Sequence, residues 1–383
     1  MSETKKKKVN ASVLMIASLI FSVALGLFVR QFIVNGGDFS EVSHPFEGHP
    51  YVVARPVDLD ERELRELVDE LEKFDDSGRG GLAFIAWPGH GVGTTYLAAE
   101  EAYEAGLLSY TGRMFLESPQ DVITVNVLNF SLQPEEFVIK LFYNYEAVAF
   151  RIVGEAHYQT TFFVELGGLY EINLPIQLDS TLTVSEYLSK LTVAAFLAPH
   201  EFVADDPFLD NISIVMNFDI DYGSNSDVAV LDVDFQEPEL RNETLTCAIC
   251  FSLESYPNIN LPSTLEVHAG EVITLTYVIG DVSDQTINAH SFAVIGMINW
   301  EQISLNNQPY LLVLGVDDIL DRSSHYGQVS FQVPDEVGYH EFAMFLVVNP
   351  LENNGRYPYW SELGPLHRFF PLSSHRFTIH VIE

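Results

Sequence analysis

Alternating apolar and polar residues over many short segments constrain the fold of this 383-residue chain more than any other feature. Residues 123–127, 137–143 and 170–176 each place apolar side chains at every second position. Successive side chains of a strand point to opposite faces of the sheet, so a period of two is typical of half-buried antiparallel strands. A second series of such segments starts at Leu265. The pattern predicts a mainly β protein with two antiparallel β-sandwich-like domains.

Three details of this pattern lead to local predictions. Residues 212–222 and 227–235 are expected to form a hairpin, because the four residues 223–226 between them suit a short loop. Pro175 lacks an N–H group and therefore indicates an edge strand. Residues 183–197 are ambiguous, since Thr183 and Glu186 form a capping box for a helix, whereas the later residues suit a strand equally well. No short-period internal repeat is visible.

The first thirty residues determine where the chain is expected to lie. Lys5–Lys8 precede an apolar run from Val9 to Val29, and the helix can extend to Val34 if Arg30 bends its side chain toward the headgroups. Lysines before the segment place the N-terminus in the cytoplasm. We therefore expect a single-pass signal anchor in the cell membrane, with the C-terminal body extracytoplasmic. A cleaved signal peptide, cut after Ala24-Leu25-Gly26, is the alternative.

The segments between these features complete the expected organisation. An amphipathic helix over 60–74, a strand over 82–87 and a helix over 96–108 predict a small α/β segment before the first β domain. Proline and glycine mark the linkers. The expected parts are a cytoplasmic tail (1–8), the transmembrane helix (9–34), a linker (35–57), the helix-strand-helix segment (58–118), the first β domain (119–240), a linker with two cysteines (241–262) and the second β-sandwich domain (263–383).

The composition excludes one class of partner. The formal net charge is −35, yet 47% of the residues are hydrophobic, so the chain is not a disordered acidic tail. After the anchor, the only lysines are Lys73, Lys140 and Lys190. Such an acidic surface repels nucleic acid and suits cations, basic partners or simple solubility. We expect contacts with the membrane through the N-terminal helix and with protein or glycan partners.

Two motifs suggest chemistry but lack the rest of the pattern that the chemistry needs. Cys247 and Cys250 have the spacing of a redox pair or half a zinc site, but no second cysteine pair exists. In an exported body, a small disulfide loop at the linker is the expected state. The glycine-rich turn over 89–95 lacks the lysine of a phosphate-binding loop, and its expected role is a turn that caps a helix.

Four carboxylates on the expected hairpin form a candidate metal site. Asp219 and Asp221 lie on one face of its first arm, and Asp232 and Asp234 lie on one face of its second arm. If the two faces coincide, a hard cation such as calcium would relieve the repulsion between the carboxylates. A solvated acidic face is the other interpretation. Apart from this calcium, no cofactor is expected.

The last domain resembles a cupredoxin in its generic β-sandwich motifs. The resemblance rests on residues 267–275, 288–292 and 338–342 and covers roughly residues 263–383. It implies a Greek-key sandwich and would imply a copper ligand at His290. The cysteine ligand of a blue-copper site is absent, because Ala343-Met344-Phe345 stand where it would be sought. An immunoglobulin-like sandwich explains the same strands.

These observations together predict a non-enzymatic function. The expected protein is a membrane-anchored extracytoplasmic binding or envelope scaffold protein, with no catalytic site. Two alternatives remain from other classes: an accessory subunit of a membrane complex, favoured by small residues along the anchor helix, and an extracytoplasmic redox or metal-binding protein.

Overall fold

The computed structural model describes fifteen stretches of the chain, and in them every regular element is a β-strand. The chain divides into two compact units, Met1–Ser43 and His44–Glu383, and all described residues belong to the second. No helix among the described residues is long and apolar enough to cross a membrane. The predicted anchor over 9–34 and the predicted helices over 60–74 and 96–108 lie outside them. The described residues are 50–57, 82–88, 113–118, 120–129, 131, 133–179, 189–205, 213–221, 235–241, 250–252, 264–279, 291–314, 324–348, 350–351 and 374–383.

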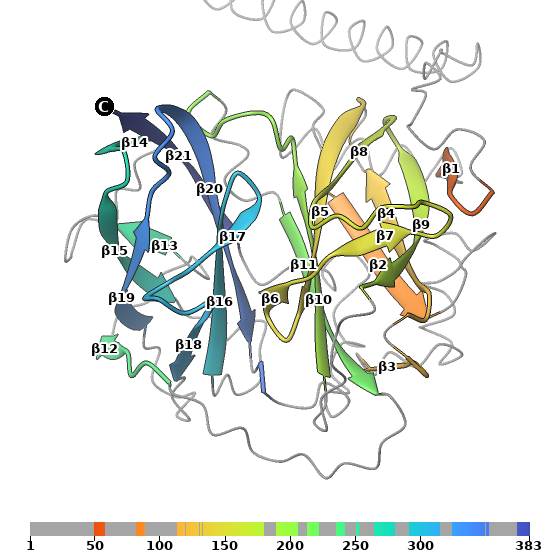
Figure 1. The fold of residues 1–383 in the computed structure, drawn as a ribbon, viewed down its shortest axis with the longest axis horizontal. Helices are drawn as coiled ribbons and strands as arrows, with labels where there is room; N and C mark the ends of the chain where they lie inside the picture. Colours follow the sequence, from red (N-terminus) through yellow and green to blue (C-terminus); the bar gives the residue numbers. More distant parts are fainter. Residues whose placement is uncertain are drawn as a thin grey trace, which may run out of the picture. The chain divides into compact units, whose positions relative to one another are not determined.

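The first sandwich consists of two sheets around one apolar core (Figure 1). Its outer sheet has the order β1-β9-β4-β2, with β7 beside β9, and its inner sheet has the order β3-β11-β10-β5-β6, with β8 beside β5. All pairs are antiparallel except β3 with β11. The strands are β1 (Val53–Pro56), β2 (Leu82–Pro88), β3 (Arg113–Phe115), β4 (Ile123–Asn129), β5 (Glu135–Tyr143), β6 (Glu146–Ala147), β7 (Phe150–Ile152), β8 (Phe162–Leu166), β9 (Tyr170–Leu178), β10 (Ser189–Leu197) and β11 (Ser213–Asp221).

The second sandwich also has an outer and an inner sheet around its own core. The outer sheet has the order β12-β19-β15-β13, and the inner sheet has the order β14-β21-β20-β16-β17, with β18 beside β16. Again a single pair, β14 with β21, is parallel. The strands are β12 (Glu239–Arg241), β13 (Cys250–Ser252), β14 (Thr264–His268), β15 (Val272–Ile279), β16 (Ser291–Ile298), β17 (Glu301–Ile303), β18 (Leu311–Leu314), β19 (Ser324–Gln332), β20 (Gly338–Val348) and β21 (Ser374–Ile382).

The two sandwiches repeat one topology, strand for strand and in the same chain order. Strands β3, β5, β6, β8, β10 and β11 of the first inner sheet correspond to β14, β16, β17, β18, β20 and β21 of the second. Strands β1, β2, β4 and β9 of the first outer sheet correspond to β12, β13, β15 and β19. Among the described strands, β7 alone has no counterpart. The parallel pair recurs at the same place in both sheets, so the body contains one β-sandwich topology twice in tandem.

A two-residue hairpin with left-handed backbone recurs at equivalent places in the two inner sheets. Asn144 and Tyr145 connect β5 to β6 with φ values of 49° and 70°, and Asn299 and Trp300 connect β16 to β17 with 48° and 67°. Positive φ at both central residues defines a type I′ turn, whose twist suits antiparallel strands. Asparagine adopts this conformation readily, whereas bulky aromatic residues rarely do. Contacts elsewhere must therefore hold Tyr145 and Trp300 in place.

The sequence prediction of a mainly β protein with antiparallel sandwiches is confirmed. The alternation predicted over residues 123–127 lies within β4, and the second series, predicted to start at Leu265, begins with β14. The ambiguous segment is a strand from Ser189 onward, and residues 181–188 lie outside the described residues. Strands β1, β2 and β3 pair within the two sheets of the first sandwich, which therefore includes strands N-terminal to the expected boundary at residue 119.

Pro175 does not mark an edge strand, because β9 has neighbours on both sides. On one side β9 pairs with β4 along its length. On the other side, β1 pairs with β9 as far as Asn173, and the pairing of β7 with β9 begins at Ile176. Pro175 therefore lies in the gap between these two short neighbours. The carbonyl of Pro175 accepts a hydrogen bond from Val153 N on that side, at 2.8 Å. The missing N–H also points to this side, where no ladder partner requires it.

Candidate functional site

The two inner sheets pack face to face, and we call this contact the junction. Its centre is apolar and buried: Val138, Phe142, Tyr145, Ala194 and Phe196 from the first sandwich meet Ala293, Ile295, Met297, Trp300, Leu312, Ala343, Phe345 and Val347 from the second. Strands β10 and β16 are consequently buried along their whole length. Each of the five residues from the first sandwich has its counterpart, by strand and hairpin position, among the residues from the second. Equivalent faces therefore meet, as in a two-fold symmetric dimer interface.

Aromatic rings fill the centre of the junction from both sides. The ring centroids of Phe142 and Phe345 lie 5.2 Å apart in an edge-to-face arrangement. Phe196 contacts Trp300 at 5.0 Å and Phe345 at 6.4 Å. Edge-to-face and tilted pairs of this kind stabilise beyond the burial of their area.

The two hairpins make reciprocal contacts across the junction. Trp300 Nε1 donates to the carbonyl of Pro199, at 2.9 Å, in the loop that follows β10. Tyr145 Oη donates to the carbonyl of Pro350, at 2.5 Å, in the loop that follows β20. Pro199 and Pro350 stand at equivalent places, two residues after the ends of equivalent strands. These paired contacts hold the two aromatic residues in their left-handed conformation.

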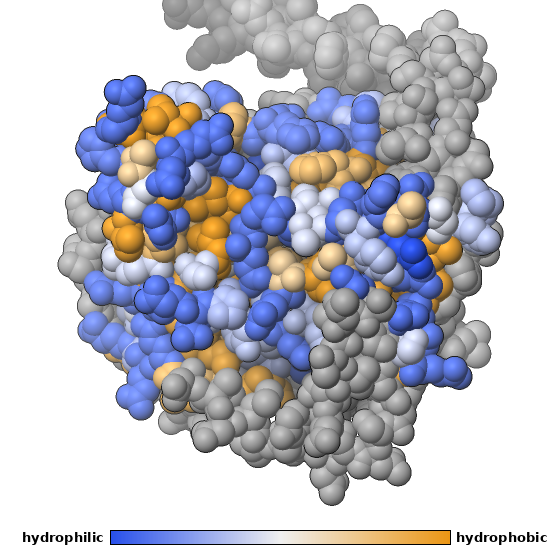
Figure 2. Space-filling view, in the orientation of Figure 1, coloured by the Kyte–Doolittle hydropathy of each residue, from blue (hydrophilic) through white to orange (hydrophobic). Residues whose placement is uncertain are grey.

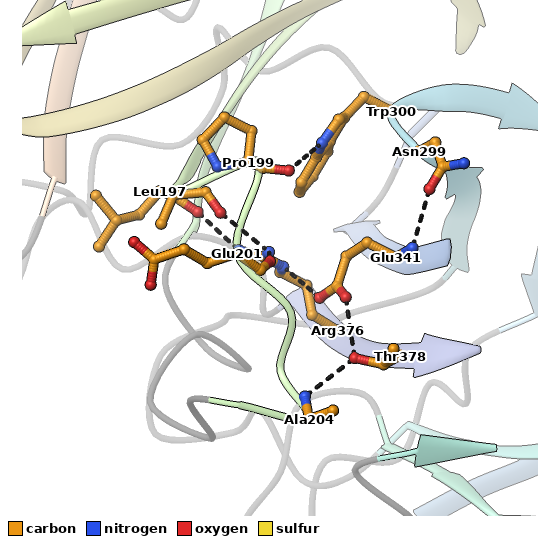
Figure 3. Close-up of polar contacts among 10 residues, drawn as sticks. Leu197, Pro199, Glu201, Ala204, Asn299, Trp300, Glu341, Arg376 and Thr378 are labelled. Carbon is orange, nitrogen blue, oxygen red and sulfur yellow. Dashed lines mark hydrogen bonds and ion pairs between the residues drawn. The ribbon is translucent and has the colours of Figure 1, made fainter. Parts of the chain in front are cut away.

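Arg376 forms hydrogen bonds to both sandwiches at the junction, and its side chain is fully buried. Nε donates to Glu341 Oε1 at 3.0 Å within the second sandwich (Figure 3). The other nitrogens donate to backbone carbonyls of the first sandwich: Nη1 to Leu197 at 2.7 Å, and Nη2 to Glu201 at 3.1 Å. The guanidinium lies 4.9 Å from the Trp300 ring centre, a cation–π distance.

Glu341 completes this network from β20. Oε2 accepts from Thr378 Oγ1 at 3.2 Å, and that hydroxyl accepts from Ala204 N of the first sandwich at 3.0 Å (Figure 3). Burial raises the pKa of Glu341, and the charge and hydrogen bond of Arg376 partly offset the effect. The network holds together only while both partners are present, since a single buried charge would be left without compensation.

Lys140 lies at the edge of the same junction. Its side chain is buried, donates to Thr161 Oγ1 at 2.7 Å and lies 3.8 Å from Glu301 Oε1 of the second sandwich. Burial lowers the pKa of Lys140 to about 8, although Glu301 acts in the opposite direction. Gln302 adds uncharged contacts. Its Oε1 accepts a hydrogen bond from Ala147 N at 2.6 Å, and its Nε2 donates to the Tyr145 carbonyl at 2.9 Å.

Of the four predicted calcium ligands, the structure describes the side chain of Asp219 alone. Asp219 is fully buried on β11 and forms an ion pair with Lys190 of β10, its direct cross-strand neighbour. The side chain of Asp221 and all of Asp232 and Asp234 lie outside the described residues. The calcium site therefore stays a prediction.

The predicted hairpin that would bring the four carboxylates together stays a prediction as well, because its loop and most of its second arm, residues 222–234, lie outside the described residues. Its first arm is confirmed as a strand, β11. At Asp219–Asp221, β11 has β10 on one side and β3 on the other.

Beside the Lys190–Asp219 pair, neutral groups of the same two strands form hydrogen bonds that lead to the junction. Thr192 Oγ1 donates to Asn217 Oδ1 at 2.9 Å, and Asn217 Nδ2 lies 3.5 Å from Tyr145 Oη. Burial raises the pKa of Tyr145 well above its ordinary value, the hydrogen bond from Asn217 opposes the rise, and the nearby charge of Asp219 adds to it. The phenol therefore stays protonated.

Two further buried polar clusters lie away from the junction. On the outer sheet of the first sandwich, Asn126 Nδ2 donates to Glu171 and Asn173, while Asn126 Oδ1 is buried without a hydrogen-bond partner. In the core of the second sandwich, Tyr277 Oη and both ring nitrogens of His325 are likewise unpaired. Burial lowers the pKa of His325, and the nearby Ile279 backbone partly offsets this.

The remaining sequence candidates fall mostly outside the described residues. These are Cys247, the side chain of Cys250, the turn over 89–95 and His290. Among the described residues, no group of three or more histidine, cysteine or carboxylate side chains could hold a metal ion. Ala343 and Phe345, which stand where a copper cysteine would be sought, belong to the junction, and Met344 lies in the core.

Sequence reasoning missed the junction altogether. It overlooked Arg376 and Glu341, because no motif marks either residue and the two lie 35 positions apart. A signal was present: residues 191–197 and 342–348 are almost continuously apolar, and such runs indicate a strand covered on both faces.

Comparisons with known proteins do not assign the chain to a family. No family model and no curated protein matches the chain. Among solved structures, the chain is similar to red sea bream transglutaminase, with 12% identity and a TM-score of 0.20, covering 82% of this chain and 33% of that one. It thus spans about a third of that protein. Fibronectin(III)-like modules of Clostridium thermocellum CbhA share 10% identity, with a TM-score of 0.18 and coverages of 70% and 87%.

A third similar structure is the C-terminal domain of the Streptococcus pyogenes antigen I/II-family protein AspA, with 9% identity, a TM-score of 0.18, and coverages of 69% of this chain and 94% of that one. TM-scores this low carry no argument. The assignment to an immunoglobulin-like β-sandwich therefore rests on the strand pairing of this chain, in which two stacked, mainly antiparallel sheets enclose each core.

Proposed function

We propose that this chain is a membrane-anchored extracytoplasmic scaffold or binding protein, whose body is one rigid unit of two fused sandwiches. The observation that carries the proposal is the junction. Domains in one chain move relative to each other unless their interface is large and hydrophobic. Here aromatic rings fill the centre, and Arg376 binds backbone carbonyls of the opposite sandwich. A rigid body of this kind suits a spacer or platform.

In this proposal the buried charges serve structure and not catalysis. Arg376, Glu341 and Lys140 are engaged in contacts between or beside the two sandwiches. Binding would then use the exposed surfaces. Figure 2 shows hydrophobic patches among hydrophilic residues, several of them over the second sandwich, whose exposed apolar residues include Val272, Val337 and Tyr339. With a formal net charge of −35, basic protein partners fit best.

The placement in the membrane is tested on the full chain in native membranes. Protease added to intact cells or spheroplasts should digest the body while a tag ahead of Lys5 stays protected. A body that becomes accessible only after lysis would refute the proposed topology. Crosslinking in the same membranes should capture partners through the body, whereas capture through the anchor helix alone would instead support an accessory subunit of a membrane complex.

Rigidity is tested by hydrogen exchange in increasing denaturant. The amides of β10 and β20 should exchange in one cooperative event, because each strand is buried by the other sandwich. If the two strands exchange at clearly different denaturant concentrations, the sandwiches are independent modules and the rigid scaffold is wrong.

A further inference from the structure

Lys190 and Asp219 form a buried pair of reactive groups. They are direct cross-strand partners on β10 and β11, and Lys190 Nζ is in direct contact with Asp219 Oδ1. The exposed fractions of the two side chains are 6% and 0%. Of the two lysines among the described residues, Lys190 contacts a buried carboxyl group, whereas Lys140 lies near an exposed one.

The backbone around this pair is held on both sides. Lys190 N donates to Asn144 Oδ1 at 2.8 Å, and the Lys190 carbonyl accepts from Asn144 N at 2.8 Å. Asp219 lies between β10 and β3 in the sheet. Neither residue can move away from the other without breaking these ladders, so the amine and the carboxyl group are kept in contact.

Amide chemistry requires a neutral amine and a protonated carboxyl group. The direct contact between Nζ and the carboxylate gives one proton a path from the first group to the second. A neutral amine is a nucleophile, and a protonated carboxyl group can release water. We propose that Lys190 and Asp219 are joined in the folded chain by an amide bond between Nζ and Cγ.

The reaction balances without any added reagent. The ammonium transfers one proton to the carboxylate, and the Nζ lone pair attacks Cγ. A second proton moves from Nζ to one carboxyl oxygen, the bond from Cγ to that oxygen breaks, and water leaves. The product is a secondary amide with one N–H and one carbonyl. One positive and one negative charge disappear together, so the net charge of the chain is unchanged.

The duplicated architecture provides an internal comparison. The positions in the second sandwich that correspond to Lys190 and Asp219 are Glu341 and Thr378, which are also cross-strand partners. That pair holds no amine, so the same bond is impossible there. The cross-link goes beyond the proposed function and is independent of the membrane tether. It would covalently fasten two adjacent strands of the first inner sheet.

Mass spectrometry of the denatured, reduced and trypsin-digested chain tests the amide. Trypsin cleaves after lysine only when the ε-amine is free. The expected product is one peptide over residues 152–241 that is not cleaved at Lys190. Its mass should be lower than the mass calculated from the sequence by one water molecule, and its fragment ions should place the link between Lys190 and Asp219. Cleavage at Lys190, or an uncut piece of full mass, would show that the pair is an ion pair only.

Lys140 is the matched control, because it is also buried but lies 3.8 Å from an exposed carboxylate. It should be cleaved in the same digest. Asp219→Asn should form the same amide with loss of ammonia, whereas Asp219→Ala should restore cleavage at Lys190. The wild-type digest decides the matter even if a variant fails to fold, because it is read on the denatured chain.

Discussion

The two sandwiches share one strand topology but differ in the residues at equivalent positions. In the first sandwich, Lys190 faces Asp219 within its own sheet. In the second, the equivalent Glu341 pairs with Arg376, which reaches the carbonyls of the opposite sandwich. The comparison teaches that the alternation of side chains and the hairpins set the topology. Single charged residues decide whether a buried polar contact stays within one sheet or joins the two sandwiches.

The largest expected effect comes from breaking the apolar face that both sandwiches share. Phe345→Asp places a charge in the centre of the junction, where Phe345 contacts Phe142 and Phe196. We expect a loss of more than about 4 kcal/mol in the free energy of unfolding, measured by urea titration. Val272→Asp is the control, since Val272 is 64% exposed in the same sandwich; its effect should stay within about 0.5 kcal/mol. Equal effects would contradict the buried junction.

Removing the domain-spanning charge should have the next largest effect. Arg376→Ala leaves Glu341 buried without its partner, and we expect a loss of about 3–5 kcal/mol in unfolding free energy. The equivalent change in the first sandwich, Asn217→Ala, removes neutral hydrogen bonds and should cost about 1 kcal/mol. Denaturant titration of both variants measures the difference. A smaller loss for Arg376→Ala than for Asn217→Ala would overturn the comparison.

Lys140 should make the stability of the first sandwich depend on pH. The second sandwich lacks this dependence, since Ile295 stands at the equivalent position. The folded pKa of about 8 lies below the ordinary value of 10.5, so the folded state binds fewer protons between these values. Stability should therefore rise as pH increases from about 8 to 10.5, by about 2 kcal/mol after allowance for solvent screening. Urea titrations across this range should show the rise in wild type and not in Lys140→Ile. An identical slope in both would disprove it.

The reciprocal hairpin contacts predict the smallest and most symmetrical effects. Tyr145→Phe and Trp300→Phe each remove one hydrogen bond to a proline carbonyl, which should cost about 1 kcal/mol. Trp300→Phe should cost slightly more, because Arg376 also stacks on its ring. Thermal unfolding measures both. If one variant is neutral, the two hairpins are not energetically equivalent.

Much of the fold followed from local pattern. Residues 123–127 alternate as a strand does and lie within β4, and the second series was predicted to start at Leu265, one residue after β14 begins. The candidate site was not predictable in this way. Asp219 was noticed as a carboxylate, but its neighbour Lys190 is 29 positions away, and no local pattern links the two residues.

The sequence by itself determined that this chain forms antiparallel sandwiches, because side-chain alternation is a property of each strand alone. The tertiary structure alone decided that the sandwiches are duplicates and that they meet through equivalent faces. Arg376 and Leu197, for example, are separated by 179 positions. Which distant faces pack against each other depends on the shapes and charges of whole sheets. The local periodicity of the sequence does not contain this information.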